Sequence, residues 1–282
     1  MYLTDQAQRG RSPWLPGDGI ATTISSNLLT SVFTAPEKVD PLPYPQASLH
    51  TQWPGSGLPG DPIFDAFYAS QIQYQNNATL TALYNNQSYV ALLDLIGKPV
   101  ILVTHSQAGL FGWQVGDARP ELIAGIVAVE PGAGPFDSYN GPPYTPGYLP
   151  LFPPNRYGIT DLPLTYDPRL PPDQSGALLR QEVSPASADR APCVLQAEPA
   201  RRLSNLATIP VLQIVGEASF QSVYSECISL YLKQAGVEVD FVRLEDVGIH
   251  GNGHFCFLEK NNIEVAERVI TPWLRGRESL NA

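Results

Sequence analysis

Apolar residues follow two different periods from residue 63 to residue 274. Short apolar runs rich in β-branched residues, typical of strands buried on both faces of a sheet, alternate with stretches that have apolar residues every three or four positions, as helices do. The predicted strands are 100–103, 122–129, 209–215 and 237–244. The predicted helical regions are 63–96, 107–117, 221–235 and 255–274. This alternation predicts an α/β fold: a mostly parallel sheet with helices on both faces and ligands at the carboxyl ends of the strands.

Two proline-rich segments lie outside this alternation, one before it and one within its range. Residues 13–62 are read as a long irregular connection. More than half of the 28 prolines lie between Pro131 and Pro199. The same segment carries the aromatic residues Tyr139, Tyr144, Tyr148, Phe152, Tyr157 and Tyr166. Because aromatic residues are depleted in disordered chains, we predict one domain over 1–282 in which 132–205 is an inserted cap whose aromatic residues line an apolar substrate pocket.

The apolar run at 100–103 leads directly into the sequence Thr-His-Ser-Gln-Ala-Gly at 104–109. A tight turn between a strand and a helix exposes a serine hydroxyl, and the backbone N–H of Gln107 is then placed to donate to an oxyanion. Ser106 is therefore the candidate nucleophile. The match to Gly-x-Ser-x-Gly is imperfect because Thr104 and Ala108 stand at the glycine positions. The alternative is an ordinary loop in which Ser106 caps a helix.

A serine nucleophile needs a base, and the chain has 4 histidines. His105 is next to the nucleophile, where the backbone is expected to turn its side chain away, and His50 lies far upstream in the irregular segment. His250 and His254 lie in the glycine-rich loop after the last predicted strand, which is where this order of elements delivers a base. We take His254 as the base and keep His250 as the alternative, with a supporting role.

The orienting acid is expected after the strand 209–215, but Ser219 stands where an aspartate would be and Glu217 is shifted. Glu130 ends the strand that follows the nucleophile, and from there its longer side chain can reach the histidine. Glu130 is therefore the predicted acid, and Glu217 is the second candidate. A surface ion pair with Arg119 is the structural alternative for Glu130.

Together these motifs resemble the bacterial and fungal α/β-hydrolases similar to esterase 713, which take their acid from the strand after the nucleophile. The matching segments are 5–12, 50–55, 60–62, 104–109, 129–131, 157–160, 163–166 and 251–254. Residue by residue, the resemblance implies that Ser106 is the nucleophile, Glu130 the acid and His254 the base. It implies a serine esterase that cleaves a small carboxylic ester through an acyl-enzyme, with no cofactor and no metal.

The resemblance also sets an expectation for the start of the chain. Residues 5–12 resemble the loop after the fourth strand of these hydrolases, so 1–5 would end that strand and the first three strands would be lacking. The loop that supplies a second oxyanion donor would be lacking too, and an open edge beside 100–103 predicts self-association and low activity. The alternative function is therefore a truncated, catalytically impaired hydrolase-fold remnant or binding module.

Charge and hydropathy limit the partners. The net charge of −10 and the isoelectric point near 4.8 argue against nucleic acid and anionic membranes, both of which would repel the chain. No apolar run approaches the roughly 20 residues of a membrane span. The predicted partner is therefore a small-molecule ester. Neither observation defines the oligomeric state.

Cysteines and glycosylation motifs bear on the compartment. Cys193, Cys227 and Cys256 are too few for a metal cage, and at most one pair could form a disulfide. Cys227 falls on an apolar helical stripe, so a simple buried role is expected for it. Sequons at Asn77 and Asn86 hint at a secretory route, which would require a signal peptide ahead of the sequence.

Overall fold

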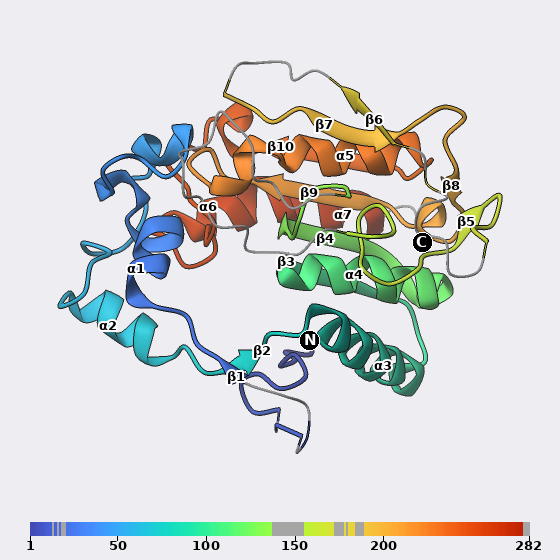
Figure 1. The fold of residues 1–282 in the computed structure, drawn as a ribbon, viewed down its shortest axis with the longest axis horizontal. Helices are drawn as coiled ribbons and strands as arrows, with labels where there is room; N and C mark the ends of the chain where they lie inside the picture. The colour runs from blue at the N-terminus through green and yellow to red at the C-terminus, as the bar shows by residue number, and fades with distance from the viewer. Residues whose placement is uncertain are drawn as a thin grey trace.

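The centre of the molecule is a four-stranded sheet in which all neighbouring strands run parallel (Figure 1). The structure, a computed structural model, describes residues 1–12, 14–15, 17, 21–136, 155–171, 178, 180–183 and 189–278. In spatial order the strands are β10 (Val239–Arg243), β9 (Val211–Val215), β4 (Ile123–Pro131) and β3 (Val100–Ser106). The predicted parallel α/β sheet is confirmed.

Helices cover both faces of this sheet (Figure 1). They are α3 (Ala78–Ile96), α4 (Gln107–Ala118), α5 (Ser225–Gln234), α6 (Asn262–Val265) and α7 (Thr271–Glu278). Alternate residues of β4 enter different apolar clusters: Ile126 and Ala128 pack with side chains of α4 and α5, whereas Val127 and Val129 pack with side chains of α6. This alternation explains why the strand sequence is apolar throughout.

The helical pattern at 63–96 is two helices, not one. The first is α2 (Pro62–Ala69), and the short strand β2 (Tyr74–Gln75) separates it from α3. Each helix has its own N-cap, because the side-chain oxygens of Asp61 and Asn77 accept backbone N–H groups of the first turn. Similarly, the helix expected at 255–274 begins only at α6, after a run of turns.

The first twelve residues form no strand, so the strand expected at 1–5 is wrong. Instead, the Ala7 N–H donates to Asn85 of α3 and the Arg9 guanidinium donates to Gln107 at the start of α4. Among the described strands, β3 has a neighbour on one side only, and Val103 keeps 65% of its surface exposed. Within the described residues, the edge of the sheet beside 100–103 is therefore unpaired, and self-association through it stays a prediction.

Part of the expected cap at 132–205 lies outside the described residues, including Tyr139, Tyr144, Tyr148 and Phe152. Its described parts include two small antiparallel pairs. These are β5 (Tyr166–Asp167) with β8 (Arg202–Leu203), and β6 (Arg180–Val183) with β7 (Cys193–Gln196). Tyr166 belongs to the core and its hydroxyl lies 2.7 Å from that of Tyr231, so the expectation that it lines a pocket is wrong. The boundaries of the cap stay a prediction.

A disulfide joins Cys193 of β7 to Cys227 of α5. Cys227 is buried, as expected, and it also belongs to the one disulfide that the cysteine count allowed; its helical stripe could show burial but not a partner from a distant strand. Cys256 is a buried free thiol. Within the described residues, no helix has the length and apolar character needed to cross a bilayer.

Candidate active site

Ser106 stands at a strained corner between β3 and α4. Its backbone angles, φ +53° and ψ −123°, are rarely adopted by residues with a side chain. The pairing of β3 with β4 shifts register between His105 and Ser106, and the helix begins at the next residue. The Ser106 side chain makes no capping hydrogen bond to the helix, so the alternative in which it serves as an ordinary N-cap does not hold.

Glycines further along α4 compensate for the two missing glycines of the turn. A Cβ on Gly112 would lie 2.9 Å from Cγ2 of Thr104, so the helix leaves the space that the threonine methyl fills. A Cβ on Gly109 would lie 2.6 Å from Cβ of Pro131, so Gly109, rather than residue 108, permits the close approach of α4 to β4. The imperfect motif therefore still produces the tight turn.

The structure brings Ser106, His254 and Glu130 together from three separate parts of the chain. His254 Nε2 lies 2.9 Å from Ser106 Oγ, and His254 Nδ1 lies 3.1 Å from Glu130 Oε2. Ser106 ends β3, Glu130 lies near the end of β4, and His254 follows β10 in a loop. The carboxyl ends of parallel strands meet at one edge of a sheet, which is why residues so far apart in sequence converge there.

Glu130 is fully buried, and its carboxyl group accepts hydrogen bonds from two further donors. The Gly216 N–H donates to Oε1 at 2.6 Å and the Ser219 hydroxyl donates to Oε2 at 2.5 Å. Ser219, which stands where an aspartate was expected, is thus a hydrogen-bond donor to the candidate acid Glu130 and not the acid itself. Arg119 pairs with Asp94, so the surface ion pair considered for Glu130 is not formed.

The buried positions decide the protonation of His254 and Glu130. Burial lowers the pKa of His254 to about 3, so the ring is neutral near neutral pH, as a proton acceptor must be. Burial also raises the pKa of Glu130, and the hydrogen bonds from Ser219 and Gly216 act against that increase. These two donors and the His254 Nδ1–H converge on the carboxylate, which leaves Nε2 to accept the proton of Ser106.

Aromatic rings account for the dry surroundings of His254. The ring centroids of Phe220, His105 and Phe33 lie 4.7, 4.6 and 5.2 Å from that of His254. The His105 Nε2–H donates to the backbone carbonyl of His254 at 2.9 Å, and burial holds the pKa of His105 well below its usual range. His105 therefore supports the loop as a neutral ring, a role that sequence reasoning missed.

The two alternatives, His250 and Glu217, contact each other and not Ser106. His250 Nδ1 lies 3.2 Å from Glu217 Oε1, and Glu217 Oε2 accepts the Gly251 N–H at 2.8 Å. The side chain of His250 is 63% exposed, whereas that of His254 is fully buried. Glu217 thus holds the loop that carries His254 but does not reach the imidazole.

A second buried histidine–carboxylate cluster supports the same loop. His50 Nδ1 lies 3.0 Å from Glu37 Oε2, and His50 Nε2 lies 3.0 Å from Glu259 Oε1. Glu259 Oε1 also accepts the Gly253 N–H at 2.8 Å. Since Gly253 immediately precedes His254, this cluster fixes the backbone that positions the candidate base. Sequence reasoning set His50 aside because it lies in the irregular segment.

This cluster predicts a loss of stability at alkaline pH. Burial alone lowers the pKa of His50, but the hydrogen bonds and charges of Glu259 and Glu37 outweigh it and raise the pKa to about 9. An unfolded histidine has a pKa of about 6.5, so the stabilisation is complete below that pH and is lost as the pH rises through about 9. In urea titrations we expect the free energy of unfolding to fall by about 3 kcal/mol over this interval.

The variant His50→Gln provides the control for that prediction. Glutamine cannot take up a proton, so the alkaline decrease should disappear while the stability of the variant at pH 6 is already reduced. A His50→Gln protein with the same alkaline decrease as the wild type would show that another group is responsible.

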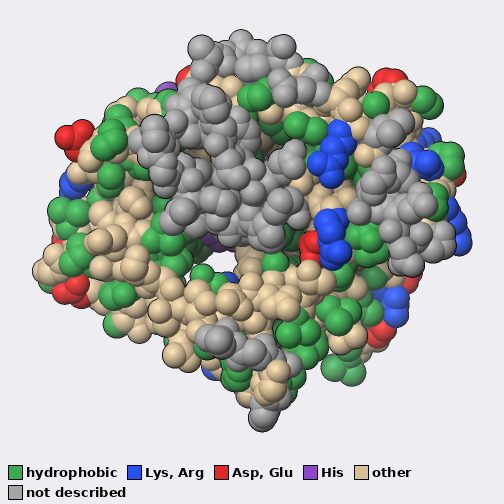
Figure 2. Space-filling view, in the orientation of Figure 1, with side chains coloured by type: hydrophobic (Ala, Val, Ile, Leu, Met, Phe, Trp, Pro, Cys, Tyr) green, Lys and Arg blue, Asp and Glu red, His purple; other side chains and the backbone are tan. Residues whose placement is uncertain are grey.

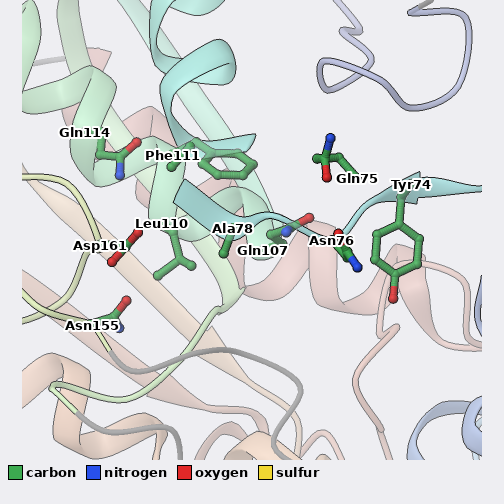
Figure 3. Close-up of a pocket in the computed structure, with 11 residues that line it drawn as sticks. Tyr74, Gln75, Asn76, Ala78, Gln107, Leu110, Phe111, Gln114, Asn155 and Asp161 are labelled. Carbon is green, nitrogen blue, oxygen red and sulfur yellow. The ribbon is translucent and has the colours of Figure 1, made fainter. Parts of the chain in front are cut away.

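A cavity of about 160 Å³ adjoins the start of α4. Its walls come from α4, from residues 74–82 and from Asn155 and Asp161 (Figure 3). Gln107, whose backbone N–H stands at the helix N-terminus, is among the lining residues, and its Oε1 accepts a hydrogen bond from Arg9 at 2.9 Å. Figure 2 shows that this face of the molecule is hollowed near its centre, toward the left end of the sheet in the view of Figure 1.

Comparison with known sequences identifies the family. Residues 31–268 match the alpha/beta hydrolase family. Over 276 residues the chain is 47% identical to the protein named Probable secreted lipase phiG, from Fungal sp. (strain ATCC 74256), and the match spans 98% of this chain and 72% of the relative. The chain therefore belongs to the alpha/beta hydrolase family, as the sequence motifs predicted.

Two solved structures show weaker similarity. A novel bacterial esterase matches 77% of this chain and 50% of its own, at 17% identity and a TM-score of 0.43. The monoacylglycerol lipase of Paleococcus ferrophilus matches 70% of this chain and 76% of its own, at 17% identity and a TM-score of 0.36. The chain thus spans about half the length of the bacterial esterase.

Proposed function

We propose that this protein is a serine hydrolase that cleaves a small carboxylic ester through an acyl-enzyme intermediate. Ser106 is the nucleophile, His254 the general base and Glu130 the orienting acid. The observation that carries the proposal is the unbroken chain of contacts from Ser106 Oγ through both ring nitrogens of His254 to Glu130. The name of the fungal relative, a secreted lipase, agrees with ester hydrolysis.

In the acylation step, neutral His254 accepts the proton of Ser106 as the serine oxygen attacks the ester carbonyl. The imidazolium that forms is stabilised by the carboxylate of Glu130. The N–H of Gln107, at the N-terminus of α4, donates to the oxyanion of the tetrahedral intermediate. When the intermediate collapses, His254 gives its proton to the departing alkoxide and the acyl group remains on Ser106.

In the deacylation step, water takes the place of the alcohol. His254 accepts a proton from the water as its oxygen attacks the acyl carbonyl, and the second oxyanion forms at the same N–H of Gln107. Collapse of this intermediate returns the proton to the oxygen of Ser106 and releases the carboxylic acid. The steps draw only on this chain and on water.

A fluorophosphonate probe tests the nucleophile directly. We expect it to label Ser106 and no other serine, because among the described residues only Ser106 has its hydroxyl within hydrogen-bond distance of an imidazole nitrogen. The label should be located by peptide mass spectrometry, and Ser106→Ala serves as the control that must remain unlabelled. Labelling of a different serine at the same rate in this variant would refute the assignment.

We also propose that the protein works outside the cytosol. The disulfide between Cys193 and Cys227 is typical of an oxidising compartment, and the fungal relative is named as secreted. Of the two sequons, Asn77 is exposed at the N-terminus of α3, whereas Asn86 is half-buried within that helix. Asn77 is therefore the better glycan acceptor.

A further inference from the structure

One buried amide close to the nucleophile has no hydrogen-bond partner. Gln114 is only 4% exposed, and neither its Oε1 nor its Nε2 has a partner in the described part of the chain. An unpaired buried donor or acceptor costs about 1–3 kcal/mol. Gln114 lines the cavity at the start of α4, but its two polar atoms have almost no accessible surface, so a partner in the cavity reaches them only when the amide turns toward it (Figure 3).

The cavity follows one face of α4. Its lining residues Gln107, Leu110, Phe111 and Gln114 follow the pattern i, i+3, i+4 and i+7, so they share one side of the helix. A rise of 1.5 Å per residue puts Gln114 about 10 Å further along the helix axis than Gln107, which directly follows Ser106. Leu110 and Phe111 give the middle of this wall an apolar character.

The Asp161 carboxylate and the Gln107 amide oxygen in the cavity wall already have partners. Asp161 accepts a hydrogen bond from the Arg156 guanidinium at 2.7 Å and another from the Thr79 hydroxyl. Gln107 Oε1 accepts one from Arg9. The cavity therefore does not require a charged ligand, and the amide at its far end offers one neutral donor and one neutral acceptor.

We propose that this cavity is a substrate subsite in which Gln114 binds a neutral hydroxyl group about 10 Å from the reacting carbonyl. A hydroxyl donates and accepts, so it pairs with both polar atoms of the amide. The apolar chain between ester and hydroxyl lies along Leu110 and Phe111. The inference rests on the proposed function and narrows its substrates to esters with a distal hydroxyl.

Matched ester pairs test the subsite. An acyl chain of about eight carbons spans this distance, so p-nitrophenyl octanoate is compared with its ω-hydroxy analogue. We expect kcat/KM to favour the hydroxylated ester by about tenfold in the wild type, mainly through KM, and the ratio to fall to about one in Gln114→Met. Octyl acetate and ω-hydroxyoctyl acetate test the alcohol side of the ester in the same way.

Two controls separate binding from structure. Gln221 is another fully buried amide with no partner among the described residues, and it does not line the cavity, so Gln221→Met should keep the wild-type ratio. The near-ultraviolet circular dichroism spectrum of Gln114→Met, compared with that of the wild type, checks that the variant is folded independently of any ester.

Each remaining outcome overturns the inference. It is wrong if the wild type has no preference in either ester pair, or if the preference survives in Gln114→Met. If the wild type cleaves p-nitrophenyl acetate but has no preference for the hydroxylated esters, the subsite is refuted and the proposed function stands. If the wild type cleaves none of these esters, both the subsite and the proposed ester hydrolysis are refuted.

Discussion

Replacing Ser106 with alanine is expected to lower kcat on p-nitrophenyl acetate by about 10⁴–10⁶-fold, and replacing His254 with alanine by a similar factor. Alanine at 106 removes the atom that attacks the carbonyl, and alanine at 254 removes the group that takes its proton. Because the two side chains act as one unit, the double variant should be hardly less active than either single variant. Steady-state hydrolysis rates over a range of ester concentrations provide the measurement.

The folded state of these variants must be checked alongside the rates. Ser106→Ala removes a hydroxyl from a strained turn and should leave the near-ultraviolet circular dichroism unchanged. His254→Ala empties space among Phe33, Phe220 and His105, so a lower melting temperature is expected for it. A folded Ser106→Ala protein with wild-type turnover would refute the mechanism in which Ser106 is the nucleophile.

Replacing Glu130 with glutamine should lower kcat by about 10³–10⁴-fold, less than the loss of Ser106. The amide NH₂ would face one of the three donors that now converge on the carboxylate, which are the Gly216 N–H, the Ser219 hydroxyl and His254 Nδ1–H. The amide would favour the imidazole tautomer with the proton on Nε2, which cannot accept the proton of the nucleophile. The loss should appear in kcat with little change in KM.

Glu217→Gln is the matched control for Glu130→Gln. Glu217 contacts His250 and the Gly251 N–H, and a glutamine oxygen can still accept that N–H, so turnover should stay within a few-fold of the wild type. If the two glutamine variants lost activity equally, the choice between the two carboxylates would have to be reversed.

The parts of the site that sequence predicted are those governed by local rules. Strand and helix periods located β3, β4, β9 and β10, and parallel strands necessarily bring their carboxyl ends together. Ser106, Glu130 and His254 could therefore be grouped before any distance was known. The contacts of 2.9 and 3.1 Å between them depend, in addition, on the loop that carries His254, which Glu217 and Glu259 hold in place.

The parts of the site that the sequence did not predict depend on contacts between distant segments, which leave no periodic pattern in the sequence. His50 and Glu259 are 209 positions apart, and His50 comes from an irregular segment that no pattern places on the sheet. The pairing of Cys193 with Cys227 likewise depends on how a short strand docks on α5. Such contacts are set by the path of loops, which composition and periodicity do not encode.

The fit between Thr104 and Gly112 has a consequence for how such turns diverge in evolution. Glycine at 104 alone would leave the space of the threonine side chain empty, and alanine at 112 alone would overlap the threonine methyl. The two positions share one small volume, so they are expected to change together and not singly. A hydrolase can then replace the first glycine of its nucleophile turn with threonine and keep the turn, provided that the helix has glycine at the position corresponding to Gly112, about two turns further on.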